Sequence, residues 1–166
     1  MALSAVAIDL DGALGDTRSL WDGFLADASR RYASIAPLDP SSLPADRGAA
    51  AQELDRWAEH GVGDWRSALG RFAEDRAPVH LRPNADASAA LRALAASGRR
   101  LGIYTDAPAE LASVALAHLG ANRRVELVET GMGARERLLA ELGPDAAVAA
   151  SREDLVRISE SGGQKP

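Results

Sequence analysis

Four short apolar segments alternate along the chain with segments that have the spacing of amphipathic helices. The apolar segments are 3–10, 100–105, 125–128 and 146–150. Short apolar runs bounded by turn residues are typical of buried strands. Strands that alternate with helices favour a parallel sheet covered on both faces. The chain is therefore expected to be an α/β protein with a three-layer, parallel-sheet core.

Several of the expected helices have readable ends. Asn84 is expected to cap a helix that stops at Gly98, and Asp106 is expected to cap the next one. Two further helices and a flexible tail follow, over 133–143, 152–160 and 161–166. Right-handed crossovers between such units place the carboxyl ends of all strands at one edge of the sheet, where ligands bind in open α/β sheets.

The segment 15–81 interrupts the alternation with three amphipathic helical stripes. It holds all but one of the aromatic residues, since only Tyr104 lies outside it. Such a concentration indicates an inserted α-helical segment with a small core of its own. The expected core domain then consists of 1–14 and 82–160.

Composition excludes several classes of function. The net charge of −5 argues against nucleic acid as a partner, because nucleic-acid-binding domains are usually basic. The absence of Cys removes disulfides, thiolate metal sites and a Cys nucleophile. No apolar run reaches the roughly 20 residues that span a membrane, and no basic region precedes the first apolar segment. We expect a cytoplasmic protein with no membrane partner, either a monomer or a homodimer.

Polar side chains follow three of the expected strands. Asp9 and Asp11 follow the first, Thr105 and Asp106 the second, and 151–154 the last. Each group has an ordinary explanation, as a turn, a helix cap or an acidic first turn of a helix. Together at one sheet edge, they offer carboxylates, a hydroxyl group and helix N-termini. That combination suits phosphoryl transfer with Mg²⁺, in which positioning and charge neutralisation dominate.

The same residues carry a resemblance to a known family. The stretch Asp9-Leu10-Asp11-Gly12-Ala13-Leu14 resembles the D-x-D-G-[TV]-L motif of haloacid dehalogenase-like hydrolases. The segment that ends at Thr105 is similar to the second motif of that family, and 15–81 lies where the family inserts a helical cap. The resemblance implies a Rossmann-like three-layer core with an α-helical cap, as in members related to phosphoglycolate phosphatase.

The resemblance also implies roles for individual residues. Asp9 would be the nucleophile that forms an aspartyl-phosphate, and Asp11 would be the general acid and base. Thr105 and the backbone near Asp106 would bind the phosphoryl group of a small phosphorylated metabolite.

Two departures from the family pattern concern positive charge and metal. The third motif needs a Lys, but the only Lys is Lys165 in the tail. An Arg must therefore take that role if it is filled, and Arg135 is the first candidate, with Arg137 the second. A solvated helix surface would explain either of these arginines equally simply.

The fourth motif has lost its first acid, because Ala150 stands where the family has Asp. The expected cofactor is Mg²⁺, held by Asp9, the backbone carbonyl oxygen of Asp11, water molecules and either Asp154 or Glu153. Losing one carboxylate should weaken such a site, since proteins hold Mg²⁺ with few ligands. Alternatively, Arg152 could neutralise the site in place of a metal ion.

Two main functional hypotheses and a third, less supported one follow from the sequence. The first is a Mg²⁺-dependent phosphatase that hydrolyses a small phosphorylated metabolite through Asp9 and Asp11. The alternative is a degenerate relative, with little or no turnover, that binds a phosphorylated ligand or a protein partner. The intact first motif favours the former, and the altered third and fourth motifs favour the latter. A non-catalytic interaction module that uses the aromatic cap is a third possibility, supported only by the aromatic content.

Overall fold

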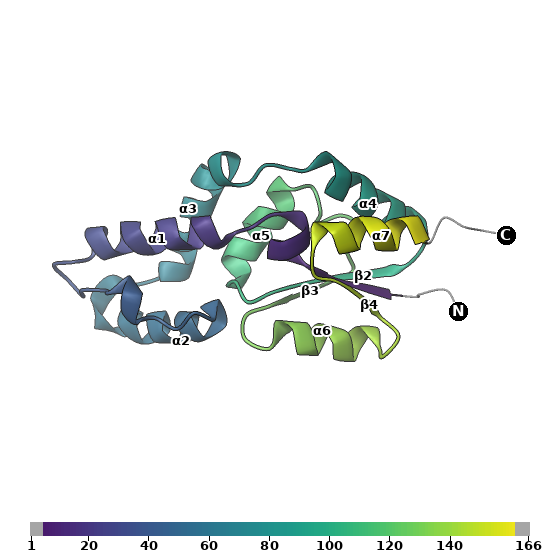
Figure 1. Ribbon diagram of the computed structural model, residues 1–166. Coiled ribbons are helices and arrows are strands. Elements are labelled where there is room, and N and C mark those ends of the chain that lie inside the picture. Colours follow the sequence, from purple (N-terminus) through teal and green to yellow (C-terminus); the bar gives the residue numbers. More distant parts are fainter. Residues whose placement is uncertain (1–4, 162–166) are drawn as a thin grey trace.

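A four-stranded, all-parallel sheet forms the centre of the computed structural model, which describes residues 5–161. The strand order is β3-β2-β1-β4 (Figure 1). The strands are β1 (Ala5–Asp9), β2 (Arg100–Thr105), β3 (Leu127–Thr130) and β4 (Ala147–Ala149). Four strands were expected and four are found; β3 starts two residues later than expected, and positions 3–4 of the first segment lie outside the described residues.

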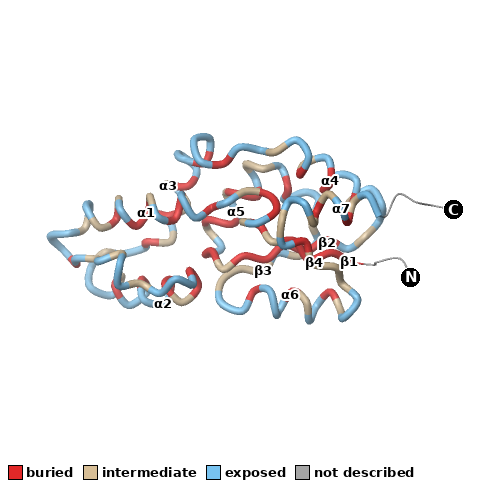
Figure 2. Tube along the Cα trace, viewed as in Figure 1, coloured by how far each residue is buried: buried red, intermediate tan, exposed pale blue. Residues whose placement is uncertain are grey.

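Helices cover both faces of the sheet, which confirms the Rossmann-like three-layer fold. One face carries α6 (Ala134–Leu142), and the other carries α4 (Ala85–Ala96), α5 (Ala109–His118) and α7 (Arg152–Ser161). Side chains alternate along β1 accordingly. Ala5 and Ala7 pack in the cluster that contains Leu138 of α6, whereas Val6 and Ile8 pack in the larger cluster on the opposite face. Figure 2 shows the buried residues concentrated on the strands and on the inner sides of the helices.

The helix ends test the expected caps. Asn84 Oδ1 accepts a hydrogen bond of 3.0 Å from Ala87 N, so this cap is confirmed. Gly133 and Gly143 flank α6 as expected. The expected cap at Asp106 is wrong: α5 begins after Pro108 without a side-chain cap, and the Asp106 carboxylate has a different partner, described below.

The inserted segment forms three helices beside the sheet: α1 (Arg18–Arg31), α2 (Arg47–Trp57) and α3 (Trp65–His80). Four of its aromatic rings make one cluster with centroid separations of 5.9–6.4 Å: Trp21, Phe24, Trp65 and Phe72. This cluster is not separate from the rest of the protein, however. Its buried side chains continue into those around β1 and β2, because α3 packs along α5.

Within residues 5–161, no helix is both long enough and apolar enough to cross a membrane.

Candidate active site

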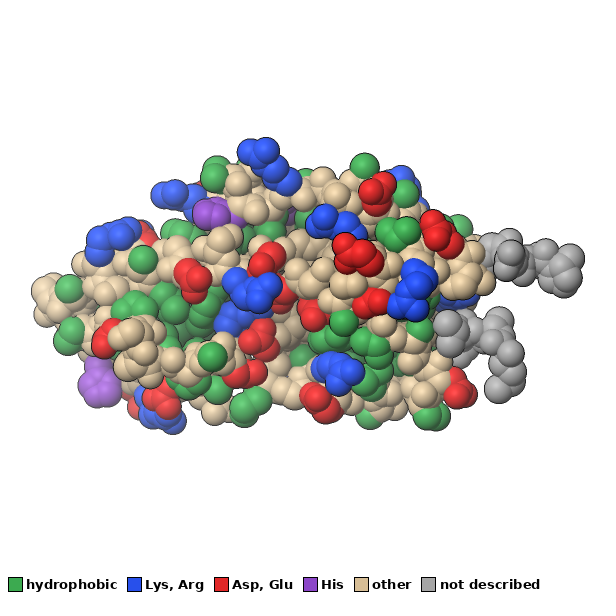
Figure 3. Space-filling view, viewed as in Figure 1, with side chains coloured by type: hydrophobic (Ala, Val, Ile, Leu, Met, Phe, Trp, Pro, Cys, Tyr) green, Lys and Arg blue, Asp and Glu red, His purple; other side chains and the backbone are tan. Residues whose placement is uncertain are grey.

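A cavity of about 690 Å³ lies between the carboxyl edge of the sheet and the start of α2. Its polar lining comes from the ends of β1 and β2, from α1, from the start of α2 and from the start of α6. The residues predicted from the sequence that it brings together are Asp9, Asp11, Thr105, Asp106 and Arg135. Basic and acidic side chains gather in the middle of the face shown in Figure 3, beside an apolar surface on the helical segment.

Asp9 ends β1 and organises the turn that follows it. Its Oδ1 atom accepts hydrogen bonds from the backbone N–H groups of Asp11 (3.0 Å) and Gly12 (3.2 Å). Burial raises the pKa of the Asp9 carboxyl group; the Gly12 hydrogen bond opposes this shift, and the charge of Asp11 adds to it. Gly12 is required sterically, since a Cβ atom there would lie 2.0 Å from the carbonyl oxygen of Ala150. The turn therefore fits tightly against the end of β4.

Both oxygens of Asp11 are engaged. Oδ1 accepts hydrogen bonds from Thr17 N (2.8 Å) and Thr17 Oγ1 (2.6 Å). Oδ2 accepts from Thr105 Oγ1 (2.8 Å) and from Arg47 Nη2 (2.6 Å). Four donors thus converge on one carboxylate, which is the number of lone-pair positions it offers. Asp11 is held by the helical segment as well as by the core.

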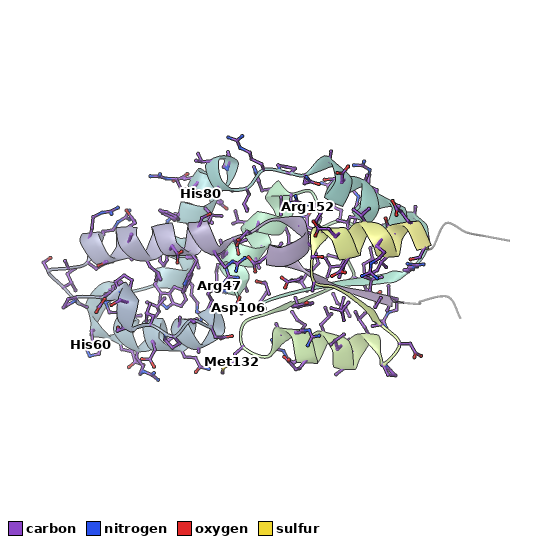
Figure 4. The ribbon with its side chains drawn as sticks, in the orientation of Figure 1. Arg47, His60, His80, Asp106, Met132 and Arg152 are labelled. Carbon is purple, nitrogen blue, oxygen red and sulfur yellow. The ribbon has the colours of Figure 1, made fainter. Side chains whose placement is uncertain are left out.

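Arg47 is a charged side chain of the cavity that the sequence did not reveal. It is the first residue of α2, is only 4% exposed, and extends into the cavity from the helical segment. Its Nε and Nη2 atoms donate to Asp106 Oδ1 at 3.0 and 2.8 Å, and its backbone N–H donates to Asp106 Oδ2 at 3.0 Å. Its Nη1 atom donates to Thr17 Oγ1 at 2.7 Å. Figure 4 shows Arg47 and Asp106 next to each other between the helical segment and the sheet.

The contact with Arg47 also affects the acidity of Asp106. Burial raises the pKa of the Asp106 carboxyl group, but the hydrogen bonds and the charge of Arg47 lower it more, so the net shift is downward.

The only clue to Arg47 in the sequence was the lack of Lys, which required any cation in the body of the protein to be Arg.

The residue after Arg47 packs directly on the core. A Cβ atom at Gly48 would lie 2.2 Å from Met132 N and 2.8 Å from the carbonyl carbon of Gly131. The start of α2 therefore sits against the backbone of the loop between β3 and α6. Arg47 and Gly48 together dock α2 onto the edge of the sheet.

The two arginines considered from the sequence have different environments. Arg135 is exposed and lines the cavity, as does Tyr104. Arg137 donates to Glu129 Oε2 at 2.8 Å and to the carbonyl oxygens of Thr130 and Met132, and it does not line the cavity. Of these two, only Arg135 is placed to meet a ligand.

Comparison with known proteins identifies the architecture. No protein-family model and no curated protein matches the chain. CbbY from Rhodobacter sphaeroides, solved in complex with phosphate, aligns with 98% of this chain and 84% of its own, with a TM-score of 0.61 and 15% identity. The chain has the haloacid dehalogenase-like fold.

Two further solved structures agree with this assignment. A Lactobacillus plantarum protein assigned as a phosphoglycolate phosphatase aligns with 96% of this chain and 84% of its own, with a TM-score of 0.57 and 16% identity. A Thermotoga maritima protein assigned as a β-phosphoglucomutase aligns with 96% of this chain and 82% of its own, with a TM-score of 0.53 and 18% identity. At these identities the likeness concerns the fold.

The metal ligands expected for a haloacid dehalogenase-like hydrolase are not assembled. Glu153 is exposed, Asp154 pairs with Arg157, and neither lines the cavity that contains Asp9 and Asp11. Across the part of the chain that the structure describes, no group of three or more Asp, Glu, His or Cys side chains is arranged to hold a metal ion. The residues present therefore do not fit the Mg²⁺ site that the sequence led us to expect. Arg152 at the start of α7 does not line the cavity either.

Acidic side chains outnumber basic side chains in the lining of the cavity. Three arginines line it, and two of them, Arg18 and Arg135, are exposed. Six acidic residues line it: Asp9, Asp11, Asp22, Asp46, Asp106 and Glu136. An anionic ligand would therefore need positive charge close to the ends of β1 and β2, and Arg47 is the buried cation that lies there.

Proposed function

We propose that the chain hydrolyses a phosphate ester of a small metabolite, through an aspartyl-phosphate on Asp9. The observation that carries this proposal is the meeting of Asp9, Asp11 and Thr105 at one cavity on the carboxyl edge of a haloacid dehalogenase-like sheet. CbbY, which shares the fold, was solved with phosphate and, as a variant, with xylulose-1,5-bisphosphate. Those ligands support a phosphorylated compound as the substrate class.

The first step of the proposed reaction belongs to Asp9. Its two hydrogen bonds fall on Oδ1, and they orient the carboxylate without engaging Oδ2. Oδ2 would attack phosphorus, and the bond from phosphorus to the ester oxygen would break. The leaving oxygen would take a proton from Asp11.

The second step regenerates Asp9. Water would give a proton to Asp11 and attack the phosphorus of the aspartyl-phosphate, the bond from phosphorus to Asp9 Oδ2 would break, and inorganic phosphate would leave with the Asp9 carboxylate restored. Thr105 Oγ1, which donates to Asp11 in this structure, would donate instead to a phosphoryl oxygen. Arg135 lines the same cavity and would add a charge-assisted contact with the phosphoryl group.

A specific observation favours the alternative of ligand binding without turnover. Asp11 is already surrounded by four donors, so it must lose at least one of them before it can carry a proton. If Arg47 stays on Asp11 when a ligand binds, Asp11 has no proton to give in the first step and no free position to accept one in the second. The protein would then retain a phosphorylated ligand and turn it over slowly or not at all.

The experiment that separates these functions is release of inorganic phosphate from p-nitrophenyl phosphate and a panel of phosphorylated metabolites, with and without Mg²⁺. The test variant is Asp9→Asn, and the control is Asp16→Asn, which makes the same chemical change at an exposed residue outside the cavity lining. We expect turnover that disappears in Asp9→Asn and persists in Asp16→Asn.

Two other outcomes are informative. Equal turnover in both variants would rule out Asp9 as the nucleophile. A folded wild-type protein with no turnover, whose melting temperature rises with a phosphorylated compound, would support the binding function instead.

A further inference from the structure

Arg47 is the buried arginine of the three that line the cavity. It reaches Asp11 at 2.6 Å and Asp106 at 2.8 Å through the same Nη2 atom, so one guanidinium group bridges two carboxylates. The side chain of Arg47 is 5% exposed and that of Asp11 is 11% exposed. At such low exposure the interaction is little screened by solvent.

The same region offers a divalent cation few free carboxylate oxygens: among the carboxylates at the ends of β1 and β2, Asp9 Oδ2 is the one oxygen with no hydrogen bond within the described residues. Position 150 at the end of β4 is Ala, and Asp154 pairs with Arg157 outside the cavity lining. Mg²⁺ prefers six oxygen ligands at about 2.1 Å in near-octahedral geometry, and its protein ligands are usually carboxylates. Both oxygens of Asp11 already accept two hydrogen bonds each, and Asp106 is paired with Arg47.

We propose that Arg47 is the resident cation of this site, acting in place of a divalent metal ion, and that Arg47 and a metal ion are alternatives. With α2 docked, the single positive charge of the guanidinium group is shared by Asp11 and Asp106, which lowers their combined charge from −2 to −1 and weakens the negative potential that would attract Mg²⁺. The side chain also fixes the orientation of Asp11, so Arg47 is a positioning residue as well as a counter-charge. This inference rests on the site described above and does not require turnover.

The test is metal binding to the 166-residue chain, measured by isothermal titration with Mg²⁺ and with Mn²⁺. Three proteins are compared: the wild type, Arg47→Gln and Arg18→Gln. The Arg18→Gln control removes the same formal charge from the same cavity lining, but Arg18 is exposed and pairs with Asp16 rather than with Asp11.

We expect the wild type and Arg18→Gln to bind Mg²⁺ equally weakly, and Arg47→Gln to bind it about tenfold more tightly or better, because two carboxylates lose their partner. Equal affinity in Arg47→Gln and the wild type would overturn the inference. So would an equal gain in Arg18→Gln, since that result would reflect net charge alone.

A measurement on the wild type keeps the inference testable if Arg47→Gln does not fold. Thermal unfolding is compared with and without about 10 mM MgCl₂ at matched ionic strength. We expect no shift of the melting temperature beyond that of the salt control. A rise of about 3 °C or more would show a competent metal site beside Arg47 and would refute the proposal.

These readouts are independent of phosphate release. A protein without turnover that gains metal binding on loss of Arg47 would uphold this inference and contradict the proposed hydrolysis. A protein that hydrolyses substrate only with Mg²⁺, and binds Mg²⁺ with Arg47 present, would contradict this inference and support the proposed hydrolysis.

Discussion

Replacing Gly48 with Ala tests whether α2 is docked on the sheet edge as the structure describes. The added Cβ atom would lie 2.2 Å from Met132 N and 2.8 Å from the carbonyl carbon of Gly131. Contacts between non-bonded heavy atoms are favourable at about 3.5–4.0 Å. Because both opposing atoms belong to the backbone, relief requires α2 to move away from the loop by roughly 1 Å.

The size of the effect follows from two opposing contributions. Overpacking of this kind typically costs about 1–3 kcal/mol of folding free energy. Ala is preferred to Gly inside a helix by up to about 1 kcal/mol, and Gly48 gains less than that because it is only the second residue of α2. We therefore expect Gly48→Ala to destabilise the protein by about 1–2 kcal/mol, which lowers the melting temperature by several degrees.

Gly70→Ala provides a matched control inside α3. A Cβ atom there would meet only Glu110 Cβ at 4.0 Å, an ordinary contact. Helix propensity should then dominate and stabilise the protein by about 0.5–1 kcal/mol.

The assay is urea unfolding followed by the fluorescence of the three Trp residues. Opposite signs in the two variants are the expected result. If Gly48→Ala is as stable as the wild type, the start of α2 does not rest on the loop between β3 and α6, and the positioning of Arg47 in the cavity loses its support.

Three further results are expected. Ala150→Asp places a carboxylate at an exposed position at the end of β4 and should raise the Mg²⁺ affinity measured by titration. The gain should be larger in the Arg47→Gln background, because the effects of positions 47 and 150 on metal binding are coupled. The contribution of Asp106 to stability should be present at pH 7 and be lost as the pH falls below about 4, since its pKa is lower in the folded state than in the unfolded chain. The difference in unfolding free energy between the wild type and Asp106→Asn should therefore become smaller as the pH falls below about 4. A difference that does not change with pH would contradict the pairing of Asp106 with Arg47. Trp65→Ala should cost about 3–5 kcal/mol in urea unfolding, because Trp65 is 3% exposed, packs on Trp21 and donates to Asp55 at 2.9 Å; a loss below about 1 kcal/mol would argue against the aromatic cluster.

Local signals predicted the elements whose determinants lie close together in the sequence. The expected strand 100–105 is β2 (Arg100–Thr105), because an apolar run bounded by polar residues is itself sufficient to define a buried strand. The Asn84 cap was also predictable, since the side chain and its N–H partner are three residues apart. The start of β3 was not, because its register depends on pairing with Gly102–Thr105, and apolar content alone does not fix a register.

The residues of the candidate site that were predicted from the sequence lie at strand ends, apart from Arg135 at the start of α6. Asp9, Asp11 and Thr105 were identified because parallel strands bring their carboxyl ends to one edge. Arg47 contacts Asp11 across 36 positions and Asp106 across 59, and no local pattern marks an arginine at the start of a surface helix as buried. The error at Asp106 has the same origin, because an Asp before a helix is typical of a cap unless a distant cation takes the carboxylate.

The packing of α3 determines which part of the helical segment can give access to the cavity. α3 lies along α5, so moving the whole segment as one body would break the packing of α3 on the core. Moving α1 away from α3 would break the aromatic cluster. α2 is an eleven-residue helix followed by Gly61 and Gly63, whose φ angles are +99° and +82°, in the region that favours glycine. Ligand exchange would then depend on the release of this one helix, a local opening of the kind that takes microseconds to seconds, while the sheet edge and α1 stay in place.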